Sequence, residues 1–132
     1  EEEGIDLSRV IIGHSGDSDD LGYLRTLMER GSTIGMDRFG LEHYLPTAKR
    51  VEVIARLAAE GYAPRMVLSH DANCWSDMLS EEAKRRTRPL WHYNHISDDI
   101  LPALRKAGVK EDQIEQMLVK NPVAIFEAGK KV

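Results

Sequence analysis

Three short apolar runs punctuate the chain, and each is followed by polar residues that could carry chemistry. The runs cover residues 10–12, 33–36 and 66–68. They are too short for helices, and apolar and polar residues do not alternate strictly within them. Because continuous apolar runs are typical of strands that are covered on both faces, the pattern predicts three parallel strands.

Amphipathic helices are predicted in the two intervals between these runs. From Asp19 to Arg30 the apolar residues recur at spacings of three and four, and the stretch from Pro46 to Glu60 carries a second such stripe. Gly31 and Gly61 follow at the positions where a helix is expected to stop. The order strand, helix, strand, helix, strand predicts a parallel sheet with right-handed crossovers.

The chain changes character after the third run. Residues 72–95 are mixed, aromatic and charged, with a short helix expected only around Ser80 to Arg86. A connection of this length inside a compact protein is typical of a functional loop.

Two further helices are predicted near the end of the chain. One runs from about Ser97 to Ala107, although Pro102 falls in its interior, where proline disfavours an α-helix. The other covers Glu111 to Val119. The Asn121-Pro122 step is expected to break the chain before a last short helix.

Composition and charge narrow the class of protein. The chain has 132 residues, with 18 Lys and Arg against 22 Asp and Glu, so its net charge is −4. This length suits one domain. The acidic balance gives no reason to expect a nucleic-acid partner, and no run approaches the ~20 apolar residues of a membrane span. The single cysteine, Cys74, excludes an internal disulfide framework and favours a reducing, cytoplasmic compartment.

Each predicted strand ends in residues that could form a site. The candidates that follow the three strands in order are His14 and Asp17, Asp37 and Arg38, and His70 and Asp71. In parallel α/β folds, ligands bind at the carboxyl ends of the strands. Histidine and carboxylate side chains are the usual ligands of zinc and similar divalent ions, which can activate water. The pattern therefore indicates a metal-dependent site at this edge of the sheet.

The same residues also allow purely structural interpretations. His14 could be a hydrogen-bonded histidine at a strand end, and Asp17 could cap the following helix. Asp37 and Arg38 could form an ion pair within a turn. Spacing alone leaves these alternatives open.

The third strand end and the long loop leave further choices open. Either His70 or Asp71 could be a ligand, and Asp71 could instead cap the short helix in the loop. The pair His92-x-x-His95 has a spacing compatible with a shared metal on a helix, but its aromatic neighbours favour packing or loop anchoring.

At this point the residues resemble a known family. The octapeptide Gly-His-Ser-Gly-Asp-Ser-Asp-Asp at 13–20 is similar to the strand-six signature of the phosphotriesterase family of metal-dependent hydrolases. Segments 35–40 and 68–71 resemble the family's strands seven and eight, and 91–96 and 121–122 resemble its closing segments. The resemblance implies an α/β fold, the (β/α)8 TIM barrel, of which residues 1–132 supply the last three βα units as the C-terminal segment of one barrel domain.

The resemblance also implies a binuclear metal centre with assigned ligands. Zinc is the expected metal, with iron, cobalt or manganese as alternatives. His14 is implied to bind the more exposed ion and Asp71 the more buried one, which assigns Asp71 rather than His70. Asp71 would accept the proton of a metal-bridging hydroxide as it attacks, and Asp17 would pass that proton on.

Arg38 bears on the substrate. An arginine followed by an aromatic residue and glycine resembles the phosphotriesterase-like lactonases, which implies hydrolysis of N-acyl-homoserine lactones with side activity on organophosphate triesters. Arg38 would hold a substrate oxygen by charge-assisted hydrogen bonds. The long loop would line the channel for the acyl chain, with Cys74 and Trp75 as apolar wall. The alternatives are a phosphotriesterase proper and a small non-catalytic α/β binding module.

The departure from the family pattern concerns the missing ligands. The family's two strand-one histidines, its carboxylated lysine on strand four and its strand-five histidine have no counterpart in residues 1–132. We therefore expect the chain to be a segment of a longer enzyme, inactive alone, whose full-length form is a homodimer.

Overall fold

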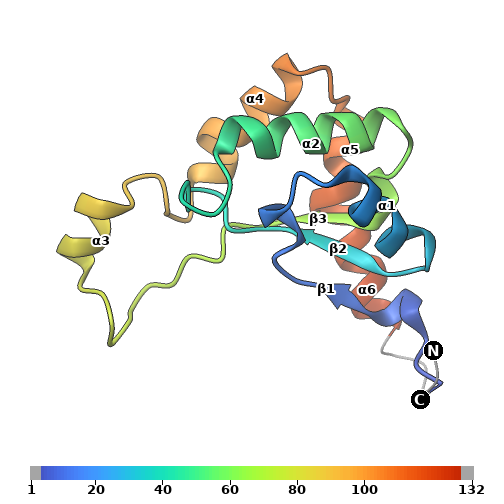
Figure 1. The fold of residues 1–132 in the computed structure, drawn as a ribbon, viewed down its shortest axis with the longest axis horizontal. Helices are drawn as coiled ribbons and strands as arrows, with labels where there is room; N and C mark the ends of the chain where they lie inside the picture. Colours follow the sequence, from blue (N-terminus) through green and yellow to red (C-terminus); the bar gives the residue numbers. More distant parts are fainter. Residues whose placement is uncertain (1–3, 129–132) are drawn as a thin grey trace.

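Three parallel strands form the sheet, in the order β1-β2-β3 (Figure 1). In the computed structural model, which describes residues 4–128, the strands are β1 (Ile11–Ile12), β2 (Thr33–Met36) and β3 (Met66–Leu68). Ile12 pairs with Ile34, and Ile34 pairs with Met66. This register brings the carboxyl ends of all three strands to one edge, and the predicted strands are confirmed.

The helices between the strands also agree with the apolar periodicity. They are α1 (Leu21–Glu29) and α2 (Thr47–Ala59). Asp20 caps α1 by accepting a 3.0 Å hydrogen bond from the backbone N–H of Tyr23. The apolar stripes of both helices enter the core, where the fully buried side chains include Leu24, Ile34, Ile54, Leu57 and Met66.

The connections contain short 3-10 turns and one separate helix. The turns are η1 (Leu7–Arg9), η2 (Ser15–Asp17) and η3 (Ala63–Arg65), and the helix is α3 (Glu81–Thr87). Ser80 caps α3 by accepting a hydrogen bond from the backbone N–H of Ala83. Figure 1 shows that α3 and the loop segments on either side of it project away from the sheet. The short helix expected near residue 80 is thus confirmed.

The C-terminal part is more continuous than its prolines suggest. Its elements are the π-helical turn η4 (Ile96–Ile100), α4 (Leu101–Lys106), α5 (Glu111–Glu115), the π-helical turn η5 (Gln116–Lys120) and α6 (Asn121–Ala128). The break expected at Asn121-Pro122 is wrong, because helical structure runs without interruption from Glu111 to Ala128.

The two π turns explain how the helices tolerate Pro102 and Pro122. The N–H of Leu101 donates to the carbonyl of Ile96, and the N–H of Asn121 donates to that of Gln116, five residues back in each case. A proline ring inside an α-helix clashes with the carbonyl four residues before it. The wider turn placed directly before each proline relieves that clash and lets the helix continue.

Asn121 fastens this last helix to the sheet. Its Nδ2 donates hydrogen bonds of 2.8 Å to the carbonyl of Ala63 and 2.7 Å to that of Met66, and the residue is buried. Asn121 therefore positions the start of β3 rather than ending a helix. Among residues 4–128 there is no helix with the length and apolar character needed to cross a membrane.

Candidate functional site

Three residues just beyond the strand ends share an uncommon backbone conformation. His14, Arg38 and Asp71 have φ angles of 60°, 61° and 54°, and they are the only non-glycine residues within 4–128 with positive φ. The left-handed conformation costs an L-residue roughly 1–2 kcal/mol. Such strained residues cluster at functional sites, where the fold holds side chains in place. All three were candidates from the sequence.

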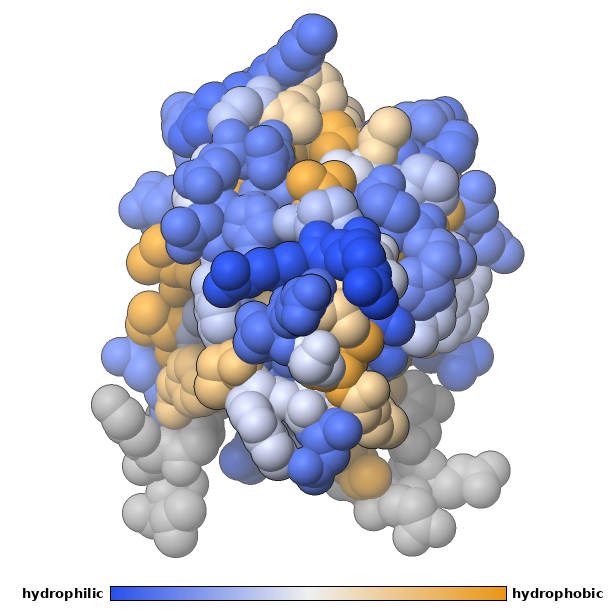
Figure 2. Space-filling view, turned by 90° about the vertical axis from the view of Figure 1, so that its left-hand side faces the viewer, coloured by the Kyte–Doolittle hydropathy of each residue, from blue (hydrophilic) through white to orange (hydrophobic). Residues whose placement is uncertain are grey.

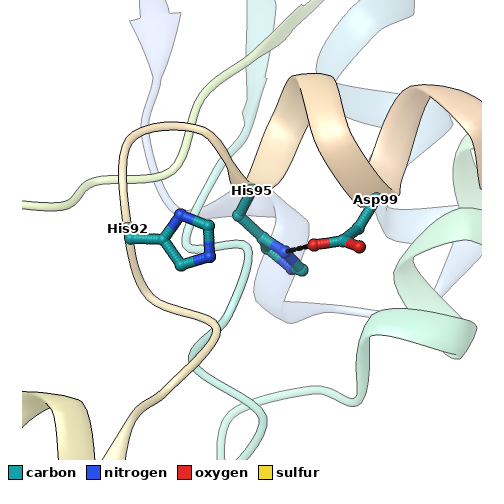
Figure 3. A group of neighbouring side chains, drawn as sticks. All are labelled: His92, His95 and Asp99. Carbon is teal, nitrogen blue, oxygen red and sulfur yellow. Dashed lines mark hydrogen bonds and ion pairs between the residues drawn. The ribbon is translucent and has the colours of Figure 1, made fainter.

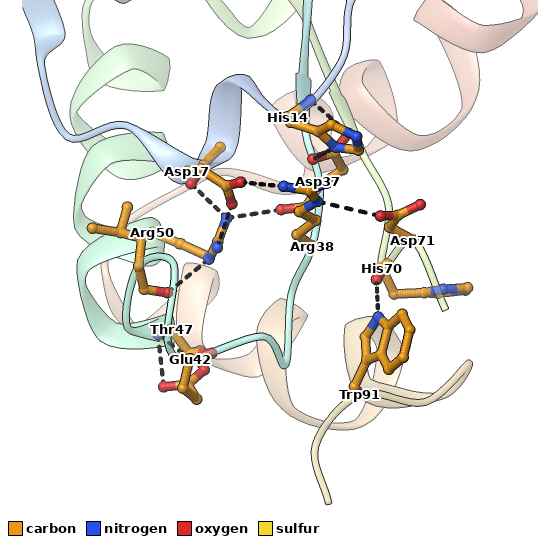
Figure 4. Close-up of polar contacts among 12 residues, drawn as sticks. His14, Asp17, Asp37, Arg38, Glu42, Thr47, Arg50, His70, Asp71 and Trp91 are labelled. Carbon is orange, nitrogen blue, oxygen red and sulfur yellow. Dashed lines mark hydrogen bonds and ion pairs between the residues drawn. The ribbon is translucent and has the colours of Figure 1, made fainter. Parts of the chain in front are cut away.

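Asp37 holds His14 in a fixed orientation (Figure 4). The carboxylate of Asp37 accepts the backbone N–H of His14 at 2.9 Å through Oδ2 and contacts ring Nδ1 at 3.1 Å through Oδ1. Because a carboxylate only accepts, Nδ1 is the donor in this contact, and in the neutral imidazole Nε2 then keeps its lone pair. His14 is therefore a hydrogen-bonded histidine at a strand end whose second nitrogen remains able to bind a ligand.

Arg38 joins two carboxylates from neighbouring strand ends. Its Nη1 donates to Oδ2 of Asp17 at 2.9 Å, and its Nε donates to Oδ2 of Asp71 at 3.3 Å. The guanidinium also lies 4.6 Å from the centre of the Tyr44 ring. Burial alone would lower the pKa of Arg38, but the hydrogen bonds to the two carboxylates raise it. The proposed ion pair between Asp37 and Arg38 is wrong, because each is engaged elsewhere.

A buried arginine supports Asp17 from the other side. Arg50 of α2 is 1% exposed, and its Nη2 donates to Oδ1 of Asp17 at 2.6 Å. Its remaining N–H groups donate to the carbonyls of Gly16, Asp37 at 2.8 Å and Leu45 at 2.9 Å. Asp17 thus has both oxygens bound by guanidinium groups. The interpretation of Asp17 as the cap of the next helix is wrong, since Asp20 caps α1.

Arg50 was missed from the sequence, although a signal existed. It precedes Ile54 by four residues and Leu57 by seven, so it lies on the apolar face of α2. A charged residue on a buried face needs partners, because an unpaired buried charge is very costly. Arg50 therefore had to be bonded to something in the core.

His70 is engaged with the loop rather than with the other candidates. Its Nδ1 accepts the N–H of Ala72 at 2.9 Å, and its carbonyl accepts Nε1–H of Trp91 at 2.9 Å. The ring stands edge-on to Tyr93, with centroids 4.8 Å apart. Trp91 thereby ties the far end of the long loop to the end of β3.

The surroundings of His70 disfavour its protonated form. Burial lowers the pKa of His70, the charge of Asp71 opposes that shift, and His92 and Lys84 add to it. Asp71 itself has a half-exposed side chain that faces Arg38. It does not cap α3, because Ser80 does so.

Cys74 and Trp75 are adjacent on the loop that projects from the sheet, but their side chains have different surroundings. Cys74 lines a pocket of about 330 Å³ whose other walls include Lys84, Arg88 and Trp91. Trp75 is 69% exposed and is not part of that lining. Figure 2, which faces the end of the molecule that carries α3, shows a largely hydrophilic surface there. A role of Cys74 and Trp75 as apolar wall stays a prediction.

The donor chemistry of the site fits divalent metal binding. Metal-bound histidines usually donate their second ring N–H to a carboxylate, which is how Asp37 holds His14. Asp71 offers an accessible carboxylate at the neighbouring strand end. One imidazole and one carboxylate are fewer ligands than a single closed zinc site requires, so a metal centre built on these two residues would need further ligands.

The solved structures that match this chain are hydrolases by their names. The chain matches the phosphotriesterase from Mycobacterium tuberculosis with a TM-score of 0.93 and 53% identity, covering 96% of this chain and 39% of that one. It matches a mutant of the organophosphorus hydrolase from Deinococcus radiodurans with a TM-score of 0.81 and 39% identity, covering 95% and 39%. These neighbours are TIM-barrel proteins, which confirms the predicted fold class.

The sequence comparison agrees with the structural one. A model of the phosphotriesterase family matches residues 1–126, so the chain belongs to this family. It is 53% identical over 126 residues to the phosphotriesterase homology protein of M. tuberculosis strain H37Rv and 38% identical over 127 residues to the aryldialkylphosphatase of Saccharolobus solfataricus. The chain spans about 39% and 40% of the lengths of these two relatives.

Proposed function

We propose that the protein containing this chain is a binuclear metal-dependent hydrolase that opens lactones of the N-acyl-homoserine type, with side activity on organophosphate triesters. The observation that carries the proposal is the position of Arg38, bonded to Asp17 and Asp71 at the strand ends beside His14. A phosphotriesterase-like lactonase from D. radiodurans supports it, since that solved structure, of a mutant, matches with a TM-score of 0.82 and 39% identity.

Two divalent ions would complete this site. The family is binuclear and metal-dependent, and we propose zinc, with iron, cobalt or manganese as alternatives. Bound ions would polarise the substrate and provide a nucleophile from water at neutral pH. His14 would hold one ion through Nε2 and Asp71 the other through its carboxylate. The remaining ligands would come from parts of the barrel outside residues 1–132, which we propose as the C-terminal segment of a single barrel domain.

The side chains on this chain have distinct proposed roles. Asp71 is positioned to accept the proton of the attacking water as its oxygen bonds to the carbonyl carbon, and Asp17 to receive that proton and pass it to solvent. The ring C–O bond then breaks, and the released alkoxide takes a proton from solvent. Arg38 lies between them and supplies N–H donors for the oxygen on which charge develops. The transfer from Asp71 to Asp17 requires Arg38 to shift toward the substrate, because its guanidinium bridges the two carboxylates.

The substrate assignment is tested by comparing catalytic efficiencies. The metal-loaded full-length protein is assayed with a long-chain N-acyl-homoserine lactone and with an aryl dialkyl phosphate triester. We expect a higher kcat/KM on the lactone, and Asp71→Asn should abolish turnover of both. A clear preference for the triester would favour the alternative, a phosphotriesterase proper.

The isolated 132-residue chain provides a separate test. With one imidazole and one carboxylate at the strand ends, it should hydrolyse neither substrate. Turnover by the purified chain alone would contradict the proposed division of the metal ligands. Cooperative unfolding of a metal-free monomer that binds a small molecule without turnover would instead support a binding module.

The partners and location of the enzyme follow from the same proposal. We propose a small-molecule lactone or phosphotriester as substrate, a homodimer in the full-length form, and a cytoplasmic location. Light scattering gives the molar mass of the full-length protein in solution. We expect the mass of a dimer, and the mass of a monomer would contradict this proposal.

A further inference from the structure

The pocket that Cys74 lines carries an excess of positive charge. Its charged lining residues include Lys84, Arg85 and Arg88 on one side of the balance and Glu81 on the other. The excess is local, because the chain as a whole has a net charge of −4. A pocket lined mainly by one sign of charge attracts ligands of the opposite sign. The proposed hydrolase mechanism uses none of these charged side chains.

Two of the three cations are left for a ligand to neutralise. Lys84 is 7% exposed, and its Nζ donates to the carbonyl of Asn73 and lies 3.7 Å from Oε1 of Glu81. Within residues 4–128, by contrast, the side chains of Arg85 and Arg88 form no hydrogen bond or ion pair. The pocket therefore keeps N–H donors that face no acceptor of the described chain.

Trp91 orients the cations without neutralising them. The guanidinium of Arg88 lies 5.5 Å from the centre of the Trp91 ring, and Nζ of Lys84 lies 4.9 Å from it. Such cation–π contacts restrain a charged group and leave its N–H groups free. Arg88 is half-buried, whereas Arg85 is exposed. Arg88 is thus the better placed of the two, and its planar guanidinium can bind a carboxylate through two parallel hydrogen bonds.

The aromatic wall of the pocket is held in place on two sides. Nε1–H of Trp91 donates to the carbonyl of His70 at 2.9 Å. The ring of His92 stands edge-on to that of His95, with centroids 5.7 Å apart, and Nδ1 of His95 lies 2.8 Å from Oδ2 of Asp99 (Figure 3). His95 is 1% exposed. A wall that is already fixed lowers the entropic cost of binding a ligand.

The pocket begins near the strand-end site. Asn73, part of its lining, follows Asp71 by two residues, so at most about 7 Å of extended backbone separates them. The volume of about 330 Å³ is small for a ligand pocket and suits one end of a substrate. Pro89, Trp91 and Tyr93 give the pocket apolar surface beside its cations. Figure 2 shows small apolar areas among strongly hydrophilic side chains on this end of the molecule.

We propose that this pocket binds a carboxylate at the far end of the substrate's acyl chain, and that Arg88 selects it. The inference rests on the proposed lactonase activity and specifies its substrate. The lactone ring is neutral and has to reach Asp71, so the acyl chain is the part of the substrate that extends into the pocket. Its methylene groups would lie along Trp91 and Tyr93, and Lys84 would add to the attraction of the carboxylate. The favoured substrates are therefore lactones whose acyl chain ends in an anion.

Kinetics on a matched pair of substrates test the selectivity. The metal-loaded full-length protein is assayed with N-octanoyl-homoserine lactone and with its analogue of equal chain length that ends in a carboxylate. The wild type should have the higher kcat/KM on the carboxylated substrate. Arg88→Gln should lower the ratio of the two kcat/KM values about tenfold, as expected for one charge-assisted hydrogen bond at a half-exposed site.

Arg86→Gln is the matched control, because it removes the same charge from α3 outside the pocket lining. It should leave the ratio unchanged. The ratio compares two substrates on one protein, so partial loss of folded enzyme does not alter it. A wild type that does not prefer the carboxylated lactone, or equal ratios in the two variants, would overturn the proposal.

Direct binding of suberate separates this inference from the lactonase assignment. Suberate is a dicarboxylate, and its diamide is an uncharged control of the same length. Suberate should shift the Nε–H resonance of Arg88 in NMR spectra and bind about tenfold more weakly to Arg88→Gln than to Arg86→Gln, whereas the diamide should not move that resonance. Equal affinities for the two variants, which capture of suberate by the metal ions alone would produce, would overturn the proposal. Absence of lactone turnover beside Arg88-dependent binding would contradict the proposed function and support the anion pocket.

Discussion

The guanidinium of Arg50 on α2 donates a 2.6 Å hydrogen bond to the carboxylate of Asp17 in the turn after β1. Arg38 donates to the other oxygen of the same carboxylate from the end of β2. Arg50 also binds the carbonyls of Gly16 and Asp37, so one buried side chain fixes the chain segments that follow two strands. The position of the candidate site thus depends on a buried residue that is not itself one of the candidate ligands.

Replacement of Arg50 should strongly destabilise the fold. Arg50→Met removes the donor to Oδ1 of Asp17 and the donors to three carbonyls. Loss of one partner of a buried ion pair costs about 3–5 kcal/mol. Arg50→Lys should be partly destabilising, because an ammonium lacks the planar set of five donors. Urea unfolding measures both. The exposed Arg56→Met is the control and should change stability by less than about 1 kcal/mol.

Arg38→Lys should reduce catalysis more than it reduces stability. Lysine keeps the charge but cannot donate to Asp17 and Asp71 at the same time. We expect kcat/KM on a lactone to fall about 10- to 100-fold, the equivalent of about one charge-assisted hydrogen bond. The measurement is steady-state kinetics of the metal-loaded full-length protein. Arg86→Lys on the exposed face of α3 is the matched control, and equal effects of the two changes would contradict the role of Arg38.

Gly40 and Gly61 form a matched pair for testing how the long loop is seated. Both have positive φ, at 91° and 94°. A Cβ on Gly40 would meet the backbone of Leu90 and Trp91 at under 3 Å, whereas one on Gly61 would meet no atom within 4 Å. Gly61→Ala should cost only the backbone strain, about 1–2 kcal/mol. Gly40→Ala should cost clearly more in urea unfolding and should displace Trp91, seen as a change in tryptophan fluorescence.

The ion pair between Arg25 and Glu60 should give stability a defined pH dependence. Hydrogen bonds from Arg25 hold the pKa of Glu60 below its ordinary value of 4.5. A depressed carboxyl pKa contributes stability above the unfolded-state value and loses it as the pH falls through the folded-state value. Arg25→Gln should therefore be less stable than the wild type near pH 7, and the difference should shrink below about pH 4.5.

That comparison is made by urea unfolding across the pH series, with NMR titration of the Glu60 carboxyl in both proteins. Lys49→Gln serves as the control, since Lys49 forms an exposed pair with Glu52 within one helix. An Arg25→Gln variant whose deficit stays constant from pH 7 to pH 4 would contradict the assignment.

The strands and the first helices were predictable because each follows from a local pattern. Apolar runs marked β1, β2 and β3, and the Ser-Asp-Asp sequence before Leu21 marked the start of α1. The C-terminal helices were less predictable, because a proline ordinarily ends a helix. The π turns before Pro102 and Pro122 depend on hydrogen bonds five residues apart, which no local sequence rule indicated.

The location of the candidate site was predictable from the sequence, whereas the pairing of its side chains was not. Its location at the strand ends followed from the positions of His14, Arg38 and Asp71, since parallel strands end at one edge. The pairing within it did not follow, because Asp37 is adjacent to Arg38 in sequence and yet binds His14. Which neighbour a side chain binds depends on the backbone conformation at each strand end. At each of the three strand ends, one residue has the left-handed conformation.

Those three left-handed residues bear on how the protein would respond to artificial selection. Glycine and asparagine adopt this backbone geometry most readily, so replacing His14, Arg38 or Asp71 by either relieves a conformational burden while it deletes a reactive group. A library screened for heat resistance alone should accumulate such replacements and lose turnover along the way. Engineering for durability should therefore keep these codons fixed and seek its gains elsewhere on the scaffold.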